Sequence, residues 1–324
     1  MTADVLQRLP AESRAAIEVF ADPHPPGAVQ RARYAGRAVV ALARSWPPDR
    51  PGLEAAISEL VDYLRRTAQT TLHQPGINNF LTYLLAEGVA GDPRVAAETL
   101  AARQKAGEDL LASAQDTCAR LGADLLKSGD TVLVNDFGPS SMHAIVARAA
   151  KDGKRLHVIA TACHTRRAHG VRAAREAKAL GHDATVVTDA GVGWAISRGG
   201  IRAAFIGADS FLPDGSVLTT NGALAIACVG ARYDTPVYSV YDLWKLLPSW
   251  SSGLTELNNL ADPDGVPESE AWVREGLAYL NPLVDCVPGR LFTGAITDVG
   301  IIPPARSGDE ARRRYGTELR LPVG

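Results

Sequence analysis

The chain has 324 residues and a formal net charge of −2 at pH 7, with 46% apolar and 22% charged residues. This length is enough for one large hydrophobic core or two moderate ones. Acidic and basic residues are interspersed, which argues against a general nucleic-acid or membrane surface. We find no apolar run of about 18 residues and no signal-peptide layout. A cytoplasmic protein that binds neither nucleic acid nor membrane is therefore expected.

The first part of the chain has apolar residues at helical spacing. Four helices are expected there, within residues 27–46, 53–69, 77–88 and 95–126. Pro47 and Pro48 close the first of them, because proline cannot continue a helix. The period becomes extended at GDTVLV, residues 129–134. We therefore predict an N-terminal helical domain over residues 1–128.

Between Thr131 and Asp242, short apolar runs alternate with helix-length segments. The runs are TVLVN, LHVIA, DATVV, AAFIG and PVYSV, at intervals of roughly 25 residues. Such alternation predicts right-handed crossovers and a parallel sheet. The expected fold class is α/β, in which an N-terminal helical bundle is followed by a Rossmann-like, doubly wound parallel-sheet domain over residues 129–306. Residues 307–324 are expected to form a charged C-terminal tail, and residues 248–270 a long surface excursion.

The four cysteines form neither a CxxC pair nor a zinc-type spacing with histidine, so no metal and no cofactor are expected. Cys118 and Cys228 lie in Ala-rich helical segments and are predicted to be buried as small apolar residues. Cys163 differs because it ends a predicted strand beside His164. It is either a reactive thiol that contacts substrate or a packed one.

Two aspartates at strand ends are the candidate reactive pair. Ligands of doubly wound sheets collect at the carboxyl ends of the strands, and Asp136 and Asp209 each follow an apolar run there. Two carboxylates that share a dry site cannot both ionise cheaply, so an acid and a base can coexist near neutral pH. Such a pair suits proton transfer on a sugar carbonyl or enediol. The alternative is that each aspartate is a turn residue or a helix cap.

Three groups of polar residues are candidates for binding an anion such as phosphate. Two groups come directly before predicted helices, whose free N–H groups favour anions, and the third is an arginine pair after the second strand. The alternatives are ordinary helix caps and solvated arginines. The loop after the first strand is neither GxGxxG nor GxxxxGK[ST], so dinucleotide and Walker-type sites are not supported. The candidates are, in chain order, Ser140, Ser141, Arg166, Arg167, Thr219, Thr220, Asn221 and Gly222.

Four segments of the chain carry a family resemblance. In order, residues 157–170, 184–196, 203–240 and 281–304 resemble the superfamily of initiation factor 2B regulatory subunits alpha, beta and delta. That superfamily also includes methylthioribose-1-phosphate isomerase and ribose-1,5-bisphosphate isomerase. The resemblance implies an N-terminal helical bundle, a Rossmann-like C-terminal domain, and dimers formed through the C-terminal domains.

The resemblance also implies roles for individual residues. In the isomerase branch, a cysteine after the first strand and the aspartate of a GAD motif act on the substrate; Asp136 matches the cysteine and Asp209 the aspartate. An Asn-Lys pair of the isomerases falls on Thr219 and Thr220, and Asp285 matches the aspartate of the family's NPxxD segment. The TNGALAIA segment and the strand-end cysteine resemble the beta-type regulatory subunits, which are not enzymes, although those subunits generally lack the GAD aspartate.

Two functions are therefore compatible with the sequence. The first is an isomerase-like enzyme of the aldose-to-ketose type, acting on a phosphorylated or otherwise anionic sugar, with Asp209 as the proton-transfer residue. The second is a non-catalytic regulatory or assembly protein that binds a sugar phosphate or a nucleotide in the same pocket. The retained Asp209 favours the enzyme, whereas the missing thiol and lysine favour the regulatory protein.

We also expect a symmetric homodimer. The apolar run over residues 287–304 and the helix that starts at Gly222 exceed what one face of a sheet needs. An obligate interface would bury roughly 2,000 Å² or more in total. The alternative is a monomer that buries these residues against its own N-terminal helices.

Overall fold

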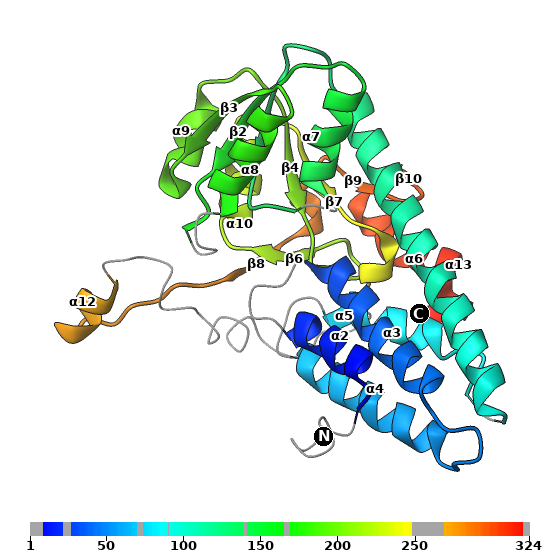
Figure 1. Cartoon of the computed structure of the whole chain (residues 1–324). Helices are drawn as coiled ribbons and strands as arrows, with labels where there is room; N and C mark the ends of the chain where they lie inside the picture. Colours follow the sequence, from blue (N-terminus) through cyan, green and yellow to red (C-terminus); the bar gives the residue numbers. More distant parts are fainter. Residues whose placement is uncertain are drawn as a thin grey trace. The chain divides into compact units, whose positions relative to one another are not determined.

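A computed structural model describes residues 9–21, 27–69, 74–89, 91–138, 141–164, 169–247 and 269–319 (Figure 1). The chain divides into two compact units. The first unit comprises residues 1–113, 244–246 and 311–324, and the second comprises residues 114–243 and 247–310. Within the described residues, no helix is both long enough and apolar enough to cross a membrane.

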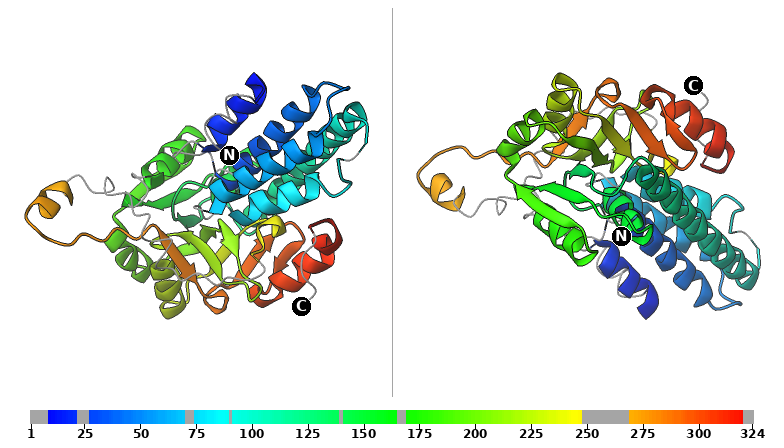
Figure 2. Two further views of the ribbon diagram at one scale, coloured as in Figure 1. Left: turned by 90° about the horizontal axis from the view of Figure 1, so that it is seen from below. Right: turned by 90° about the horizontal axis from the view of Figure 1, so that it is seen from above.

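The first unit is helical. Its helices are α2 (Ala11–Ala21), α3 (Ala28–Arg44), α4 (Leu53–Gln69), α5 (Gln74–Leu84), the first part of α6 (Pro93–Asp124) and most of α13 (Ser307–Leu319). Helix α3 packs against α2, α4 and α5, which lie beside it in both views of Figure 2. The core consists of large side chains that are almost fully buried, among them Phe20, Ile57, Leu60, Leu64, Ile77, Phe80, Leu81 and Leu84. The four predicted helices are confirmed as α3 to α6, and the sequence analysis missed α2.

The second unit is built on a seven-stranded sheet. The strands, in chain order, are β1 (Thr131–Val134), β2 (His157–Thr161), β3 (Asp183–Val187), β4 (Ile201–Gly207), β7 (Val237–Val240), β9 (Gly294–Thr297) and β10 (Gly300–Ile302). Their order in the sheet is β10-β9-β7-β4-β1-β2-β3, and only β10 runs antiparallel to its neighbour. The five predicted strands are confirmed, and so is the α/β fold class.

Helices cover both faces of this sheet (Figure 2). Helices α7 (Met142–Lys151) and α8 (His169–Ala179) lie on one face, and α9 (Val192–Ser197) and α10 (Ala223–Arg232) lie together on the other. Residues of α7 and α8 join β1, β2 and β4 in one apolar core, which includes Val134, Ile145, Val158 and Phe205. Helices thus cover the sheet on both faces, which is what parallel strands require.

A second, three-stranded antiparallel sheet follows β4 directly. It consists of β5 (Ser210–Phe211), β6 (Val217–Thr220) and β8 (Val284–Val287), in the order β5-β6-β8. The last residue of β6 is only three residues before α10, so this small sheet fixes where α10 begins. The sequence analysis did not predict it as a sheet.

The strand order places a topological switch point between β1 and β4. The chain first moves outward from β1 to β2 and β3, and then returns to the other side of β1 at β4 before continuing to β7. In doubly wound sheets the crevice at the carboxyl ends of the strands beside this point is the usual ligand site. Asp136 and Asp209 follow these two strands.

Several sequence-based limits can now be compared with the structure. The division into units falls inside α6, at Ser113, whereas the sequence places a boundary near residue 128; the domain limits stay a prediction. Residues of the expected charged tail form helix α13 (Ser307–Leu319), and Ser269–Arg274 form the short helix α12. Most of the expected surface excursion lies outside the described residues.

The predictions for two helical cysteines had different outcomes. Cys118 is buried, as predicted, but the prediction for Cys228 is wrong because its side chain is exposed. Helix α10 buries the stripe formed by Ala223, Ile226 and Ala227, and position 228 points to its other side. Helical periodicity, rather than the Ala-rich composition, decides which residues are buried.

Candidate functional site

The candidate site lies at the carboxyl ends of β1, β2 and β4, where the backbone turns sharply. Asp136 and Cys163 follow β1 and β2 with φ angles of +67° and +55°. A non-glycine residue rarely adopts this left-handed conformation, and such strain clusters at functional sites. Asp209, which follows β4, is half-buried, and its N–H donates to Leu218 O at 3.0 Å.

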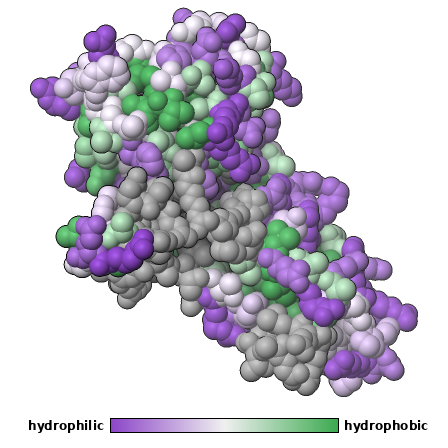
Figure 3. All heavy atoms as spheres, turned by 60° about the vertical axis from the view of Figure 1, so that its left-hand side comes forward, coloured by the Kyte–Doolittle hydropathy of each residue, from purple (hydrophilic) through white to green (hydrophobic). Residues whose placement is uncertain are grey.

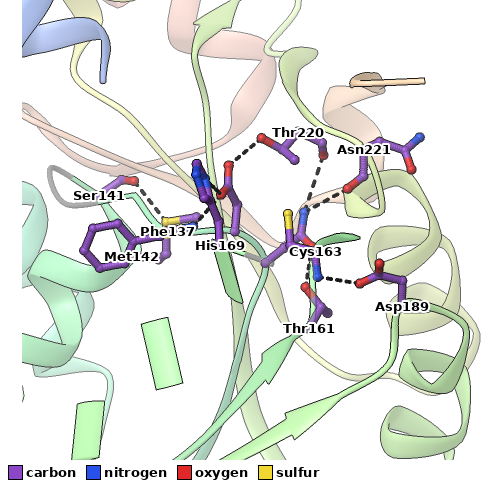
Figure 4. A network of polar contacts seen from close by, with 11 residues as sticks. Phe137, Ser141, Met142, Thr161, Cys163, His169, Asp189, Thr220 and Asn221 are labelled. Carbon is purple, nitrogen blue, oxygen red and sulfur yellow. Dashed lines mark hydrogen bonds and ion pairs between the residues drawn. The ribbon is translucent and has the colours of Figure 1, made fainter. Parts of the chain in front are cut away.

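The Asp136 carboxylate connects three segments of the second unit. The Thr220 hydroxyl donates to Oδ2 at 2.5 Å, and the N–H of Phe137 donates to Oδ1 at 2.6 Å. The Nδ1 of His169, the first residue of α8, lies 3.0 Å from the same Oδ1. Figure 4 shows His169 and Thr220 reaching this carboxylate from different elements. We call Asp136, His169 and Thr220 the Asp136 cluster.

Asn135, which directly precedes Asp136, holds together the strand ends beside this cluster. Its side chain is 2% exposed, and its Oδ1 accepts from the Thr161 hydroxyl at 2.6 Å. Its Nδ2 donates to the carbonyl oxygens of Thr220 and Asn221, each at 3.4 Å. A buried amide with both ends engaged fixes the ends of β1, β2 and β6 relative to one another.

The turn after β2 is shaped by Asp189. Its Oδ1 accepts from the N–H of Cys163 at 2.7 Å, and its Oδ2 accepts from the N–H of His164 at 2.9 Å. The Nδ1 of His164 lies 3.0 Å from the same Oδ2. Cys163 is 1% exposed, which supports a packed thiol over a reactive one.

At the start of α10, where an anion could bind, the carboxylate of Asp285 already accepts the hydrogen bonds. The N–H of Leu224 and the Nδ2 of Asn221 donate to Asp285, at 2.9 and 3.2 Å. Burial raises the pKa of Asp285, and hydrogen bonds from the backbone of Leu224, Gly222 and Ala223 oppose this rise. Gly222, the N-cap residue, has a φ of +98°, which favours glycine. We call this arrangement the Asp285 cap.

The predicted anion-binding hydroxyls are engaged within the protein. Thr219 donates to Gly207 O at 2.6 Å, and Thr220 donates to Asp136. Ser141 is the N-cap residue of α7 but makes no side-chain capping bond; its hydroxyl lies 3.5 Å from Gly138 O. As substrate contacts, these residues, Asn221, Gly222 and Asp285 stay predictions. Ser140, Arg166 and Arg167 lie outside the described residues.

A small pocket opens beside the Asp136 cluster. It is lined mostly by apolar side chains of β1, β2, α7 and α8, together with Asp136 and His143. Burial lowers the pKa of His143. The pocket's cavity volume of about 10 Å³ is no more than a single water molecule needs, far below the roughly 300–1,000 Å³ typical of ligand pockets. This pocket alone therefore does not hold a sugar phosphate.

The sequence analysis missed His169, and it gave no site role to Asn135 and Thr161, although both stand at predicted strand ends. His169 begins a helix 33 positions after Asp136, so no local pattern joins the two residues. Asn135 and Thr161 each end or follow an apolar strand, and that position was the available signal. Among the described residues, no group of three or more His, Cys, Asp or Glu side chains is arranged to hold a metal ion.

Comparisons with known proteins agree with this architecture. The model of the initiation factor 2 subunit family matches residues 27–304. A ribose 1,5-bisphosphate isomerase of Haloterrigena turkmenica is 26% identical over 308 residues, which cover 91% of each chain. A methylthioribose-1-phosphate isomerase of Thermosipho melanesiensis is 29% identical over 203 residues, or 57% of this chain and 56% of that protein. The alignment with that isomerase thus spans little more than half of its length.

Two solved structures share the fold. Translation initiation factor eIF-2B of Pyrococcus horikoshii has a TM-score of 0.71 at 23% identity, covering 92% of this chain and 99% of that one. The 5-methylthioribose 1-phosphate isomerase of the same organism has a TM-score of 0.72 at 17% identity, with coverages of 95% and 92%. The fold is therefore common to sugar-phosphate isomerases and to initiation factor subunits, and by itself it does not separate the two functions.

Proposed function

Because this chain belongs to the initiation factor 2 subunit family, we propose that it is an isomerase that converts a pentose 1-phosphate into the corresponding ketose phosphate. The isomerases among its relatives are named for methylthioribose 1-phosphate and ribose 1,5-bisphosphate. Both compounds are riboses with a phosphate on C1. The shared part of these substrates defines the class that we assign to this chain.

The observation that carries the proposal is the position of Asp209. This half-buried aspartate follows β4, directly across the switch point from the end of β1. The carboxyl ends of these two strands are where a doubly wound sheet binds its ligand. A carboxyl group at that place can exchange a proton with a bound sugar.

The reaction needs two proton transfers and no external oxidant or reductant. The bond between C1 and the ring oxygen breaks, its electron pair stays on the oxygen, and that oxygen takes up a proton. Hydrogen with its bonding pair passes from C2 to C1. The electron pair of the O–H bond on C2 forms the new C2=O double bond, and the proton of that hydroxyl goes to a base. We assign the proton delivery to Asp209.

A second candidate function is non-catalytic binding, in which the chain senses a sugar phosphate or a nucleotide. The observation in its favour is that polar groups at the site are already satisfied internally. The carboxylate of Asp136 accepts from Thr220 and Phe137, and the Asp285 cap occupies the first amides of α10. Such a site would bind a ligand but would leave no carboxylate available for proton transfer.

Incubation of the purified protein with ribose 1,5-bisphosphate and methylthioribose 1-phosphate distinguishes the two functions. The isomerase is expected to produce a ketone carbon that ¹³C NMR detects. Asp209→Asn should lower kcat by about 10²–10⁴-fold, because it removes a proton-transfer group. The matched control is Asp152→Asn, a change beyond the far end of α7 that removes only an ion pair with Arg148.

Calorimetric binding of the same two compounds completes the test. Binding without any ketone product would support the regulatory function and contradict the isomerase. Product formation that Asp209→Asn leaves unchanged would retain the isomerase and remove the role of Asp209.

A further inference from the structure

His169 is held in one orientation by the Asp136 cluster. Its Nδ1 lies 3.0 Å from Asp136 Oδ1. An ionised carboxylate only accepts hydrogen bonds, so Nδ1 carries the hydrogen and donates it. In the neutral ring, the lone pair then lies on Nε2. Within the part of the chain that the structure describes, Nε2 makes no hydrogen bond.

The ring is also accessible from the side of the site. The side chain of His169 is 44% exposed, whereas that of Asp136 is 19% exposed. The imidazole is thus the more accessible group of the pair for a ligand. Figure 4 shows the His169 ring at the carboxyl edge of the sheet, near Thr220.

The position of the ring depends on a close approach between α8 and β2. A Cβ atom on Gly170 would lie 1.5 Å from the carbonyl oxygen of Thr161. Only glycine therefore lets the first turn of α8 come this near to the end of β2. This approach places His169, the first residue of α8, beside Asp136, which follows β1.

We propose that His169 is the base that takes the proton from the C2 hydroxyl of the sugar, and that Asp136 is its positioning residue. This inference rests on the proposed isomerase function and supplies its second proton-transfer group. By the family resemblance, Asp136 stands where the isomerases have a thiol. In this chain a histidine from the next crossover, oriented by that aspartate, takes over the role of the missing group.

The proton balance of this step is complete. The proton leaves O2 for Nε2 as the C2 carbonyl forms, and the ring becomes an imidazolium whose positive charge the Asp136 carboxylate stabilises. The former ring oxygen receives its proton from Asp209. Exchange with solvent then returns one proton to Asp209 and removes one from His169. This division of labour matches other His-Asp pairs, in which the carboxylate fixes the tautomer and does not itself take the proton.

Among the described residues, the charged and titratable groups beside Asp136, Phe137 and His169 come from three elements. Asp136 follows β1, and Arg172 lies one turn along α8, with its guanidinium 4.2 Å from the centre of the Phe137 ring. His143 of α7 packs on the same Phe137, with ring centres 4.9 Å apart. The carboxylate is the group in hydrogen-bond contact, so it governs which nitrogen carries the proton.

Kinetics of three variants test the pair, with ribose 1,5-bisphosphate as substrate. His169→Gln should lower kcat by about 10²–10⁴-fold with little change in KM, because it removes the base. Asp136→Asn should lower kcat as well, since an amide can hold the wrong tautomer. The double variant should be no slower than His169→Gln alone, because the two residues act as a unit. His157→Gln, at the half-buried start of β2 away from the site, is the matched control and should retain full activity.

Two results would overturn the inference and leave the isomerase standing: an active His169→Gln enzyme, or a double variant whose loss is the product of the single losses. Long-range ¹H–¹⁵N NMR of the imidazole supplies a readout that does not depend on turnover. The wild type should show hydrogen on Nδ1, Asp136→Asn should change that tautomer, and ribose 1,5-bisphosphate should shift the Nε2 signal. A ring that does not respond to this sugar phosphate contradicts the inference, even in an inactive protein.

Discussion

Two aspartates of the second unit, Asp136 and Asp285, differ in the kind of hydrogen-bond partner that their carboxylates have. In the Asp136 cluster, the carboxylate meets a titratable and partly exposed histidine at the end of β1. In the Asp285 cap, the carboxylate accepts from backbone amides and from the amide of Asn221 at the start of α10. Both lie near the carboxyl edge of the main sheet, and both are half-buried.

The partners, rather than the aspartates, distinguish these two places. Amides at a helix start cannot titrate, so the Asp285 cap stabilises one conformation of the turn before α10. An imidazole can accept a proton and pass it on, so the Asp136 cluster can take part in a reaction. Four predictions concern these two places and the elements around them.

The largest effect concerns the outer face of α10, the helix that the Asp285 cap begins. Leu224 of α10 and Trp194 of the adjacent α9 are 37% and 67% exposed. Figure 3 shows apolar side chains gathered on this side of the second unit. We predict a symmetric homodimer that buries roughly 2,000 Å² or more in total through this face. Light scattering should give twice the chain mass of 34.3 kDa.

Variants on matched surfaces check this assignment. The double change Trp194→Asp and Leu224→Asp should give a single-chain mass at micromolar concentration. Leu180→Asp is the control, because Leu180 is 38% exposed but follows α8 on the opposite face of the sheet. A wild-type protein with the mass of one chain at all concentrations refutes the dimer.

The next effect concerns the support of His169. Gly170→Ala should destabilise the fold by about 3 kcal/mol, because the added methyl overlaps the Thr161 carbonyl oxygen. Chemical denaturation measures this loss. Gly193→Ala is the control, since no heavy atom lies within 4 Å of a Cβ added there. Equal stability of the two variants would show that α8 and β2 are not as close as the structure has them.

A smaller effect is expected at the Asp285 cap. Asp285→Ala should lower the free energy of unfolding by about 2 kcal/mol, because the amides of α10 lose their acceptor. Sulfate should restore part of the loss, since the exposed helix start then becomes an anion site. Asp285→Asn keeps one acceptor oxygen and should lose less. If sulfate stabilises the wild type and Asp285→Ala equally, the cap is not what occupies those amides.

The smallest effect is the pH dependence of the same carboxyl group. Burial raises the pKa of Asp285 above its ordinary value of 3.8, so the folded protein holds this proton more tightly than the unfolded chain. Its contribution to stability is therefore largest below 3.8 and falls as the pH rises through the raised value. The unfolding free energy of the wild type minus that of Asp285→Asn should decrease over this range. An increase would reverse the sign of the shift.

The sequence predicts the main fold because that information is local. The apolar runs of β1, β2, β3, β4 and β7 and the helical spacing of α3 to α6 are visible in windows of a few residues. The positions of Asp136 and Asp209 at strand ends follow from the same pattern. The small sheet escaped prediction because β5 has two residues and β6 merges with the turn before α10.

The contacts that give the site its chemistry are not local. His169 meets Asp136 across 33 positions, and Asp285 meets Leu224 across 61. Composition and periodicity identify a polar residue at a strand end, but they do not show which distant side chain will satisfy it. For this reason the sequence analysis identified the aspartate at the end of β1 and missed the histidine that changes its role.

A crystal structure of the Asp209→Asn variant with ribose 1,5-bisphosphate tests the central claim most directly. The account predicts a sugar at the carboxyl ends of β1 and β4, with its C2 hydroxyl at a hydrogen-bond distance of about 2.6–3.2 Å from His169 Nε2. Asp136 should remain bound to Nδ1 of the same ring. A sugar phosphate bound elsewhere, or a His169 ring that turns Nε2 into the protein, would contradict the account.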